Sequence, residues 1–452
     1  MSANNSATRY YNLPCRPRVN VNFPDRAEVD RLVDDLPFPS FARVRYDPPT
    51  ETIDDPEKAV RSELERLDLG HLDPGAKIAV GAGSRGITGM DAVIEETVSY
   101  VSEQGFEPVV VPAMGSHGGA TPEGQREVLE ALGITEESVG TPIDARMEAR
   151  RLDTVTVGDT EMPVHFSEAA LDADAILVAN RIKAHTSFTG PFESGLTKMT
   201  VVGLGKQAGA NAFHSTAIAE GYVETLSAAL DVILESAPVL GGIGLVENFD
   251  KETAHIEAIE ADSFRDREPE LLELAYDEMA TLPIDDIDLL VVDELGKDVS
   301  GTGMDTNVIG RYRVLNAPDP EKPDIDLIYV RNLTESSKGN GTGIGLADVT
   351  RRSAIEQFDV QKTYANAITS GSLPKAKIPI VAPDDELAMR ISLAALGGYD
   401  PETVRIVWIK NTQKLDEFYV SESLIDELPD AATVVGRERL AFPGGDRSFD
   451  PE

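Results

Sequence analysis

The 452-residue chain is poor in cysteine and lysine and contains no long apolar run. Its one cysteine, Cys15, excludes an internal disulfide and any zinc or iron–sulfur site built from cysteines. No apolar stretch approaches the roughly 20 residues that a membrane-spanning helix needs. The first residues also lack the charged and apolar regions of a signal peptide. These absences favour a cytoplasmic protein with no membrane partner.

Basic residues are few, because 41 Lys and Arg face 79 Asp and Glu, for a net charge of -38. Only 14 of the basic residues are lysines. The acidic residues are spread along the whole chain, which favours a hydrated acidic surface over a disordered acidic tail. This pattern is typical of salt-adapted, haloarchaeal-type proteins; an acidic protein from a low-salt environment is the alternative. Nucleic acid is not expected as a partner, because like charges repel.

Several common catalytic motifs are absent as well. The chain has no HExxH, no paired HxH and no cysteine pair, so a conventional zinc site has no support. It has no GxSxG elbow, and its GLGK at 203–206 lacks the Walker A spacing and the following Ser or Thr. The glycine-rich run at 81–89 lacks the acidic residue on the next strand that a dinucleotide-binding fingerprint requires.

Short apolar runs alternate with helical patterns from residue 77 onward. Runs typical of buried strands lie at 77–83, 106–115 and 174–180, and helical spacing fills 90–105 and 122–133. Strands and helices that alternate through short links predict a parallel sheet covered by helices. Farther on, we expect a strand at 200–205, a helix of about 30 residues from Gln207, and paired strands at 241–248 and 253–261.

The same alternation restarts near 270–280, which predicts a second unit. We therefore expect two α/β domains with largely parallel sheets and an interdomain cleft. Residues 1–275 form the N-terminal domain and residues 276–452 the C-terminal domain. The acidic, proline-bearing tail from about 421 either frays or packs back onto one of the domains, and packing on the N-terminal domain is one of these alternatives.

Two glycine-rich loops, at 81–89 and 115–120, follow predicted strands, where open α/β sheets place their ligands. Free backbone N–H groups in the first loop, together with Arg85, indicate anion binding; a purely structural turn is the alternative. In the second loop His117 stands between Ser116 and Gly118 and has little packing to do. It is either a general base or metal ligand, or a solvated loop histidine.

A third loop combines His185 and Lys198 with Arg181 and Lys183. So many cations beside one imidazole indicate an anionic substrate or cofactor, and a basic surface loop is the alternative. His214 follows Lys198 by sixteen residues and, taken alone, is an ordinary helix histidine. The other three histidines are interpreted as structural or surface residues: His71, His165 and His255.

Taken together, these segments resemble the nickel-pincer lactate racemase family and its uncharacterised relatives. The resemblance rests on GSHGGATPEG at 115–124, on an Asn…His…Gly…Lys segment ending at Lys198, and on the histidine sixteen residues beyond that lysine. It covers residues 75–220 well and the second half loosely. It implies a lactate-racemase-like N-terminal domain that holds the cofactor and the catalytic residues.

The resemblance also implies specific roles. Lys198 would carry the nickel-pincer nucleotide, a pyridinium mononucleotide whose thioamide link forms on the lysine amine. His214 would bind the nickel, and His117 and His185 would form the proton-transfer pair. Further cofactor-binding positions would be Gly83, Ser84 and Gly118. Substrate-binding positions would be Arg85, Lys183, Asn307 and Arg311.

The family's Asp-x-Thr-Arg-Pro substrate loop is replaced here by GAGSRGITG, so we expect a substrate other than lactate. The implied activity is a racemase or epimerase that inverts carbon 2 of a small anionic 2-hydroxy acid by reversible hydride transfer. One alternative is an epimerase of larger sugar acids with the same cofactor. Another is a non-catalytic relative that binds an anion or a nucleotide. A histidine-ligated metallohydrolase is disfavoured, because no His/Asp/Glu ligand cluster is visible.

The charge excess makes a direct prediction about stability. Repulsion among surface carboxylates is weakly screened in dilute salt, because the Debye length is about 10 Å at 0.1 M and about 3 Å at 1 M. The unfolding temperature should therefore rise markedly between about 0.1 M and about 2 M KCl. Circular dichroism melts across that series measure it, and a flat series would contradict the salt-adapted interpretation.

Overall fold

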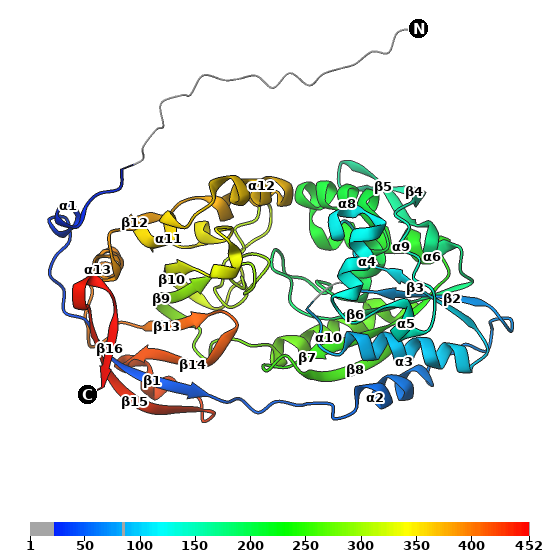
Figure 1. Cartoon of the computed structure of the whole chain (residues 1–452), viewed down its shortest axis with the longest axis horizontal. Helices are drawn as coiled ribbons and strands as arrows, with labels where there is room; N and C mark the ends of the chain where they lie inside the picture. Colours follow the sequence, from blue (N-terminus) through cyan, green and yellow to red (C-terminus); the bar gives the residue numbers. More distant parts are fainter. Residues whose placement is uncertain (1–21, 84–85, 452) are drawn as a thin grey trace, which may run out of the picture.

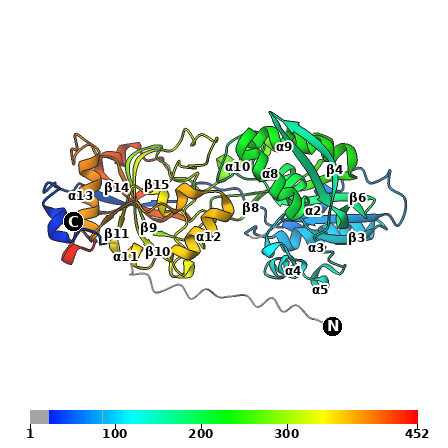
Figure 2. The same cartoon turned by 90° about the horizontal axis from the view of Figure 1, so that it is seen from above.

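The computed structural model describes residues 22–83 and 86–451 and has two lobes, each built around one sheet (Figure 1). The first lobe contains a five-stranded sheet and the second a nine-stranded sheet. Seen from above, the lobes lie side by side along the long axis (Figure 2). The predicted α/β class with largely parallel sheets is confirmed. Cys15, Ser84 and Arg85, which the sequence singled out, lie outside the described residues.

The sheet of the first lobe has four parallel strands and one antiparallel edge strand, β8. The parallel strands therefore end at one edge, where the loops of interest begin. In sheet order the strands are β3 (Glu107–Pro112), β2 (Lys77–Ala82), β6 (Ala175–Arg181), β7 (Val239–Glu247) and β8 (Thr253–Glu260).

Alternate residues of the central strands enter two separate cores. Ile78 and Val80 pack into one core, whereas Ala79, on the opposite face of β2, packs into the other. Helices bury their apolar sides on both faces, which explains the nearly continuous apolar runs of the sequence. On the first face lie α2 (Pro56–Leu64), α3 (Met90–Glu103), α4 (Pro122–Glu130) and α5 (Glu136–Val139). On the second lie α6 (Glu168–Leu171), α8 (Lys206–Glu220), α9 (Tyr222–Ser236) and α10 (Phe264–Glu278).

Two expectations for this lobe were wrong and one was confirmed. The run at 200–205 is not a strand: a short helix, α7 (Leu196–Lys198), continues into the π-helix η2 (Met199–Gly203). Short apolar runs cannot be assigned from periodicity alone. The expected 30-residue helix is split into α8 and α9 at Gly221, whose positive φ (107°), which favours glycine, ends α8. The paired strands at 241–248 and 253–261 are β7 and β8.

A separate hairpin, β4 (Ala149–Val157) with β5 (Thr160–Ser167), packs on α8 and α9. The sequence analysis did not single out this pair of strands. Burial alternates along β5, with Met162, Val164 and Phe166 in the core. The hairpin thus covers the outer side of the two helices.

The sheet of the second lobe is parallel on one side and antiparallel on the other. Its parallel strands are β12 (Ile380–Ala382), β11 (Val349–Arg351), β10 (Asp324–Leu333), β9 (Asp286–Leu295) and β13 (Ile406–Asn411). The antiparallel strands continue as β14 (Lys414–Ser421), β1 (Ser40–Tyr46), β15 (Ala432–Ala441) and β16 (Ser448–Pro451). Its helices are α1 (Arg26–Asp30), α11 (Arg352–Glu356), α12 (Val360–Ser370) and α13 (Asp385–Ala395).

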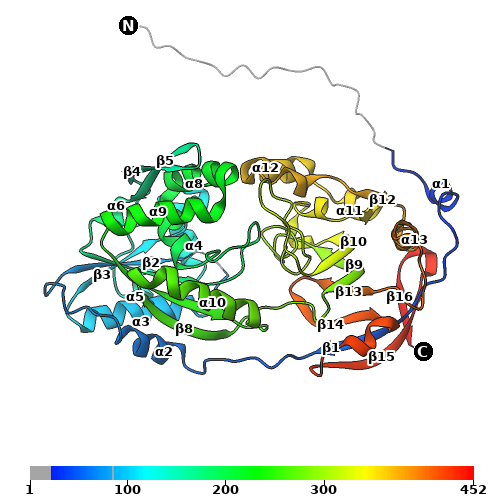
Figure 3. The same cartoon turned by 180° about the vertical axis from the view of Figure 1, so that it is seen from behind.

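Both ends of the described chain join the second lobe. β1 lies between β14 and β15, and its chain then runs along the molecule to α2 in the first lobe (Figure 3). The assignment of residues 1–275 to one domain is therefore wrong for β1, because its ladder partners come from the far end of the chain. The tail from about 421 packs on the second lobe and not on the N-terminal domain, because β15 and β16 extend the second sheet.

A buried ionic network fastens the tail to the second lobe. The carboxylate of Asp385 is fully buried and accepts hydrogen bonds from Tyr329 Oη at 2.6 Å and from Arg331 Nη2 at 2.6 Å. It also accepts the backbone N–H of Arg447, in the turn before β16, at 2.9 Å. Removing one partner of a buried ion pair strands the other charge away from water.

Asp385→Asn should therefore lower the free energy of unfolding by about 3–5 kcal/mol, because Arg331 and Arg351 lose the fully buried carboxylate with which both pair. Asp446→Asn is the matched control: its side chain is 74% exposed and pairs with Arg351 at the surface, so the loss should be at most about 1 kcal/mol. Urea unfolding at constant salt measures both. Equal losses in the two variants would contradict the role given to the buried network.

Candidate active site

The candidate residues come from three neighbouring strand ends of the first lobe. His117 follows β3, Gly83 follows β2, and Lys183 and His185 follow β6. Because these strands are parallel and adjacent, their carboxyl ends open at one edge of the sheet. The helix pair that follows β6 then returns Lys198 and His214 to the same region.

His185 is the most strongly perturbed imidazole of this group. Burial lowers its pKa well below the ordinary value, and Lys198, Lys183, His214 and Lys375 lower it further. Its Nδ1 is buried and has no hydrogen-bond partner among the described residues. The ring packs against Phe188 in a tilted arrangement, with 4.5 Å between centroids and 37° between the ring planes. His185 is thus a neutral imidazole with a nitrogen left for a ligand.

Lys198 ends α7 and enters the π-helix, a rare element that is frequent at functional sites. Burial lowers the pKa of its amine to about 7, helped by Lys183 and opposed by Glu193. No salt bridge to Lys198 occurs among the described residues. A large share of the amine is therefore neutral at neutral pH, and a neutral amine is the nucleophilic form.

His214 lies on α8, with its ring edge-on to Phe213. Burial lowers its pKa to about 4, and Lys198 and His117 lower it further. More than a third of its surface is nevertheless open to solvent. A neutral imidazole that solvent can reach can ligate a metal ion.

A buried lysine, which the sequence did not reveal as part of the site, supports the loop that carries His117 through hydrogen bonds. Lys206 Nζ donates to Pro112 O at 2.9 Å and to Gln125 Oε1 at 3.3 Å. Gln125 Nε2 in turn donates to Gly115 O at 2.9 Å. Lys206 also has a left-handed backbone (φ 53°), which is uncommon for a residue other than glycine. This chain of bonds fixes the loop that presents His117.

Two lysines bring further positive charge to His185. Burial lowers the pKa of Lys183 to about 8 and that of Lys375 to about 8. Lys375 comes from the second lobe, is 1% exposed, and has its Nζ 3.5 Å from Thr186 O. The sequence analysis missed Lys375, and its only signal was the scarcity of lysine. The site therefore draws cations from both lobes.

Two buried carboxyl groups were also missed. Glu268 of α10 is 1% exposed and accepts Thr197 N at 2.9 Å and Thr197 Oγ1 at 2.6 Å. Burial raises the pKa of Glu268 to about 7. Gly195 leaves room for it, since a Cβ there would meet Glu268 Oε1 at 2.0 Å. Glu268 thus anchors the turn that carries Lys198. Glu193 is likewise buried, and its carboxylate accepts a hydrogen bond from the backbone N–H of His185.

Two of the predicted site positions have their hydrogen-bond donors engaged by other groups of the protein. Arg311 is buried and donates to Leu346 O, Ile325 O, Asp326 O and Asp348 Oδ2, so its guanidinium stitches loops of the second lobe together. A role for it in substrate binding is therefore withdrawn. Gly83 donates its N–H to Ala179 O, so this N–H is not directed to a ligand. A Cβ at Gly83 would meet Asn180 Oδ1 at 2.4 Å, which accounts for the glycine.

Asn307 contacts the loop that carries His185, and Gly118 lines a hollow beside the loop that carries His117. Asn307 Nδ2 donates to His185 O at 3.2 Å and Asn307 Oδ1 accepts Tyr312 Oη at 2.7 Å, so its amide holds the His185 loop. Gly118 has a left-handed backbone (φ 67°), and a hollow of about 490 Å³ is lined by Gly86, Gly118 and Gly124. The two glycine-rich loops thus border one hollow.

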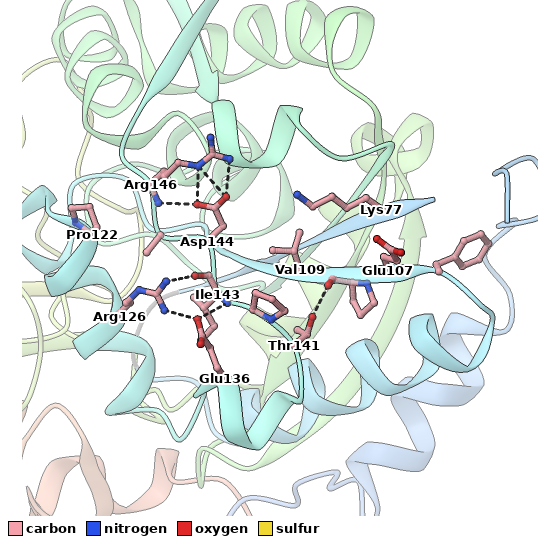
Figure 4. Close-up of a pocket in the computed structure, with 14 residues that line it drawn as sticks. Lys77, Glu107, Val109, Pro122, Arg126, Glu136, Thr141, Ile143, Asp144 and Arg146 are labelled. Carbon is pink, nitrogen blue, oxygen red and sulfur yellow. Dashed lines mark hydrogen bonds and ion pairs between the residues drawn. The ribbon is translucent and has the colours of Figure 1, made fainter. Parts of the chain in front are cut away.

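Two further hollows are present. One, of about 760 Å³, lies beside β3 and is lined by none of the predicted site residues (Figure 4). Its arginines are already paired, Arg126 with Glu136 and Arg146 with Asp144. A hollow of about 590 Å³ lies where the lobes meet, and Tyr276, Asn307 and Tyr312 line it.

The chain is similar to a family model and to a solved structure. The family model DUF362, a domain of unknown function, matches residues 79–300. A solved structure of the lactate racemase apoprotein from Thermoanaerobacterium thermosaccharolyticum is similar, with a TM-score of 0.46 and 13% identity over 83% of this chain and 89% of that chain. No curated protein matches the sequence.

Residues 22–83 and 86–451 contain no cluster of three or more His, Cys, Asp or Glu side chains arranged to hold a metal ion. In the same residues no helix is both long enough and apolar enough to cross a lipid bilayer.

The lowered pKa of Lys198 can be measured by its reactivity. Half of its amines should be neutral near pH 7, so acetylation with trace acetic anhydride should follow a midpoint near pH 7. Lys322, whose pKa is raised by its hydrogen bond to Asp285, is the internal control and should react only at much higher pH. Peptide mass spectrometry reads both sites in one sample. A shared midpoint for the two lysines would contradict the desolvation of Lys198.

Proposed function

We propose that this protein is an isomerase, a racemase or epimerase that inverts carbon 2 of a small anionic 2-hydroxy acid. One observation carries the proposal: amines and imidazoles from separate strand ends converge as desolvated groups, in a chain of net charge -38. Carboxylates are abundant in this sequence, yet within residues 22–83 and 86–451 no salt bridge joins one of them to Lys183, Lys198 or Lys375. Cations held this way suit an anionic ligand.

The donor set fits the nickel-pincer nucleotide that the sequence resemblance implies. Lys198 offers a partly neutral amine for a covalent link, and His214 offers a neutral imidazole for nickel. The hollow beside Gly86 and Gly118 offers room at a glycine-rich turn, where backbone N–H groups suit a phosphate. When bound, this group would supply the acceptance and return of hydride at carbon 2.

The chain's own residues would then manage charge and protons. Lys183 and Lys375 would bind the substrate carboxylate from the two lobes. His185 and His117 would each take or return the proton of the substrate hydroxyl oxygen, one for each enantiomer. Two bases are needed because the enantiomers present their hydroxyl groups to opposite sides. A neutral imidazole is the form that accepts a proton, which matches the lowered pKa of His185.

The proposal is tested with protein made alongside the enzymes that synthesise the cofactor. The parent should carry a mononucleotide-sized adduct and one nickel, and it should interconvert the enantiomers of at least one 2-hydroxy acid. Lys198→Ala should lose the adduct and all turnover, since it has no amine to form the link. His214→Ala should retain the adduct but lose most of the nickel, because a metal ligand is removed.

His255→Ala is the matched control, because His255 lies on β8 and pairs with Glu257 away from these residues. It should keep the adduct, the nickel and the turnover. Intact mass, metal content and a chirality assay over a panel of 2-hydroxy acids provide the readouts. Turnover that survives in Lys198→Ala, or a parent isolated from that host as a bare polypeptide with zinc, would refute the proposal.

A further inference from the structure

The loop that carries His185 is closed on itself. Lys183 N donates to Ser194 O at 2.8 Å, and Ser194 N donates to Lys183 O at 3.2 Å. The residues between form a compact turn whose ends lie side by side. Loops of this kind hold their shape through internal contacts rather than through a sheet. The position of His185 therefore depends on the groups that bind the inside of this turn.

The side-chain carboxylate of Glu193 lies inside this turn and binds its backbone. Glu193 is 1% exposed, and its Oε2 accepts the backbone N–H of His185 at 2.5 Å. Its Oε1 accepts Gly190 N at 3.1 Å and Tyr276 Oη at 2.8 Å. Both carboxylate oxygens are thus engaged by donors of the loop and of α10. Within the described part of the chain, no salt bridge involves Glu193.

The carbonyl group of the same residue, which belongs to the next peptide, is held by the second lobe. His185 O accepts Asn307 Nδ2 at 3.2 Å, and Asn307 Oδ1 accepts Tyr312 Oη at 2.7 Å. Tyr312 Oη also lies 3.2 Å from Thr189 Oγ1, in the loop itself. The backbone N–H of His185 is therefore bound by a residue of the first lobe, and its backbone carbonyl by a residue of the second lobe.

The hydroxyl groups of Tyr276 and Tyr312 take part in these two sets of contacts. Tyr276 lies near the end of α10, the last helix of the first lobe, and Tyr312 follows β9 in the second. Both line the hollow of about 590 Å³ where the lobes meet. A movement of one lobe against the other would stretch the bond from Asn307 to His185 before it disturbed the core of either lobe.

We propose that Glu193 and Asn307 are positioning residues that hold the His185 peptide between the lobes, so that His185 is aligned for proton transfer only when the lobes are docked. This inference rests on the proposed role of His185 in proton transfer. Neither residue needs to touch the substrate. Small displacements of a proton-transfer group have large effects, since a shift of about 1 Å can lower the rate about 100-fold.

The first test uses the protein without cofactor. Glu193→Gln replaces one acceptor oxygen with an NH₂ group, so either His185 N or the Gly190 and Tyr276 pair loses its acceptor. Amide hydrogen exchange of peptides spanning 183–194 should become about tenfold faster, because a net hydrogen bond is worth about 1 kcal/mol or more to a charged acceptor. Asn307→Ala should accelerate the same peptides.

Tyr276→Phe is a milder variant that keeps the proposal testable if Glu193→Gln fails to fold. Its matched control is Tyr399→Phe, which removes a hydroxyl that donates to Pro37 O, far from the site. The first substitution should accelerate exchange in 183–194 and the second should leave that segment unchanged. Parent-like exchange in folded Tyr276→Phe and Asn307→Ala would overturn the inference.

The second test uses cofactor-loaded enzyme and separates alignment from binding. Glu193→Gln and Asn307→Ala should each lower kcat about 100-fold while KM stays within about twofold. The double variant should be little worse than either single one, because both act on one peptide. A change confined to KM would overturn the inference. Faster exchange in 183–194 in a protein that acts on no 2-hydroxy acid would leave the positioning intact and refute the proposed function instead.

Discussion

The structure depends on removing positive and potentially positive groups from water without giving them carboxylate partners. Such burial favours the neutral form of an amine or an imidazole. Lys198, His185 and His214 all show this effect, and Lys183 and Lys375 extend it toward the second lobe. The chain has many acidic residues, so these buried lysines lack carboxylate partners in the described part of the chain because of where the fold places them, and not because acidic residues are scarce.

The rest of the fold maintains this arrangement. Parallel strands bring the His117 and His185 loops to one edge, and the π-helix turns Lys198 toward them. Glu268 anchors that turn through Thr197, while Lys206 and Gln125 hold the loop that follows β3. The second lobe contributes Lys375 and the amide of Asn307. The site is thus built by both lobes, although most of its residues come from one.

Much of this could be predicted from local sequence. Apolar runs that end in glycine predicted the strands, and the rule that ligands bind at carboxyl ends of parallel strands predicted which loops would hold the site. Lys375, Glu193 and Glu268 could not be found that way, because their importance arises from burial by distant segments. β1 was misplaced for the same reason, since its ladder partners lie hundreds of residues away. Arg311 looked like an anion ligand until the carbonyl groups around it were known.

The most direct test of the desolvated cation cluster is the number of protons taken up when an anion binds. A bound carboxylate should raise the pKa of Lys183 and Lys375, which are about 8 in the free protein, and the protein should take up protons from buffer near pH 8. Calorimetric titration with lactate, malate and gluconate, repeated in buffers of different ionisation enthalpy, measures that uptake. The account predicts net uptake on binding. Binding without proton uptake, or no binding of any of these acids, would contradict it.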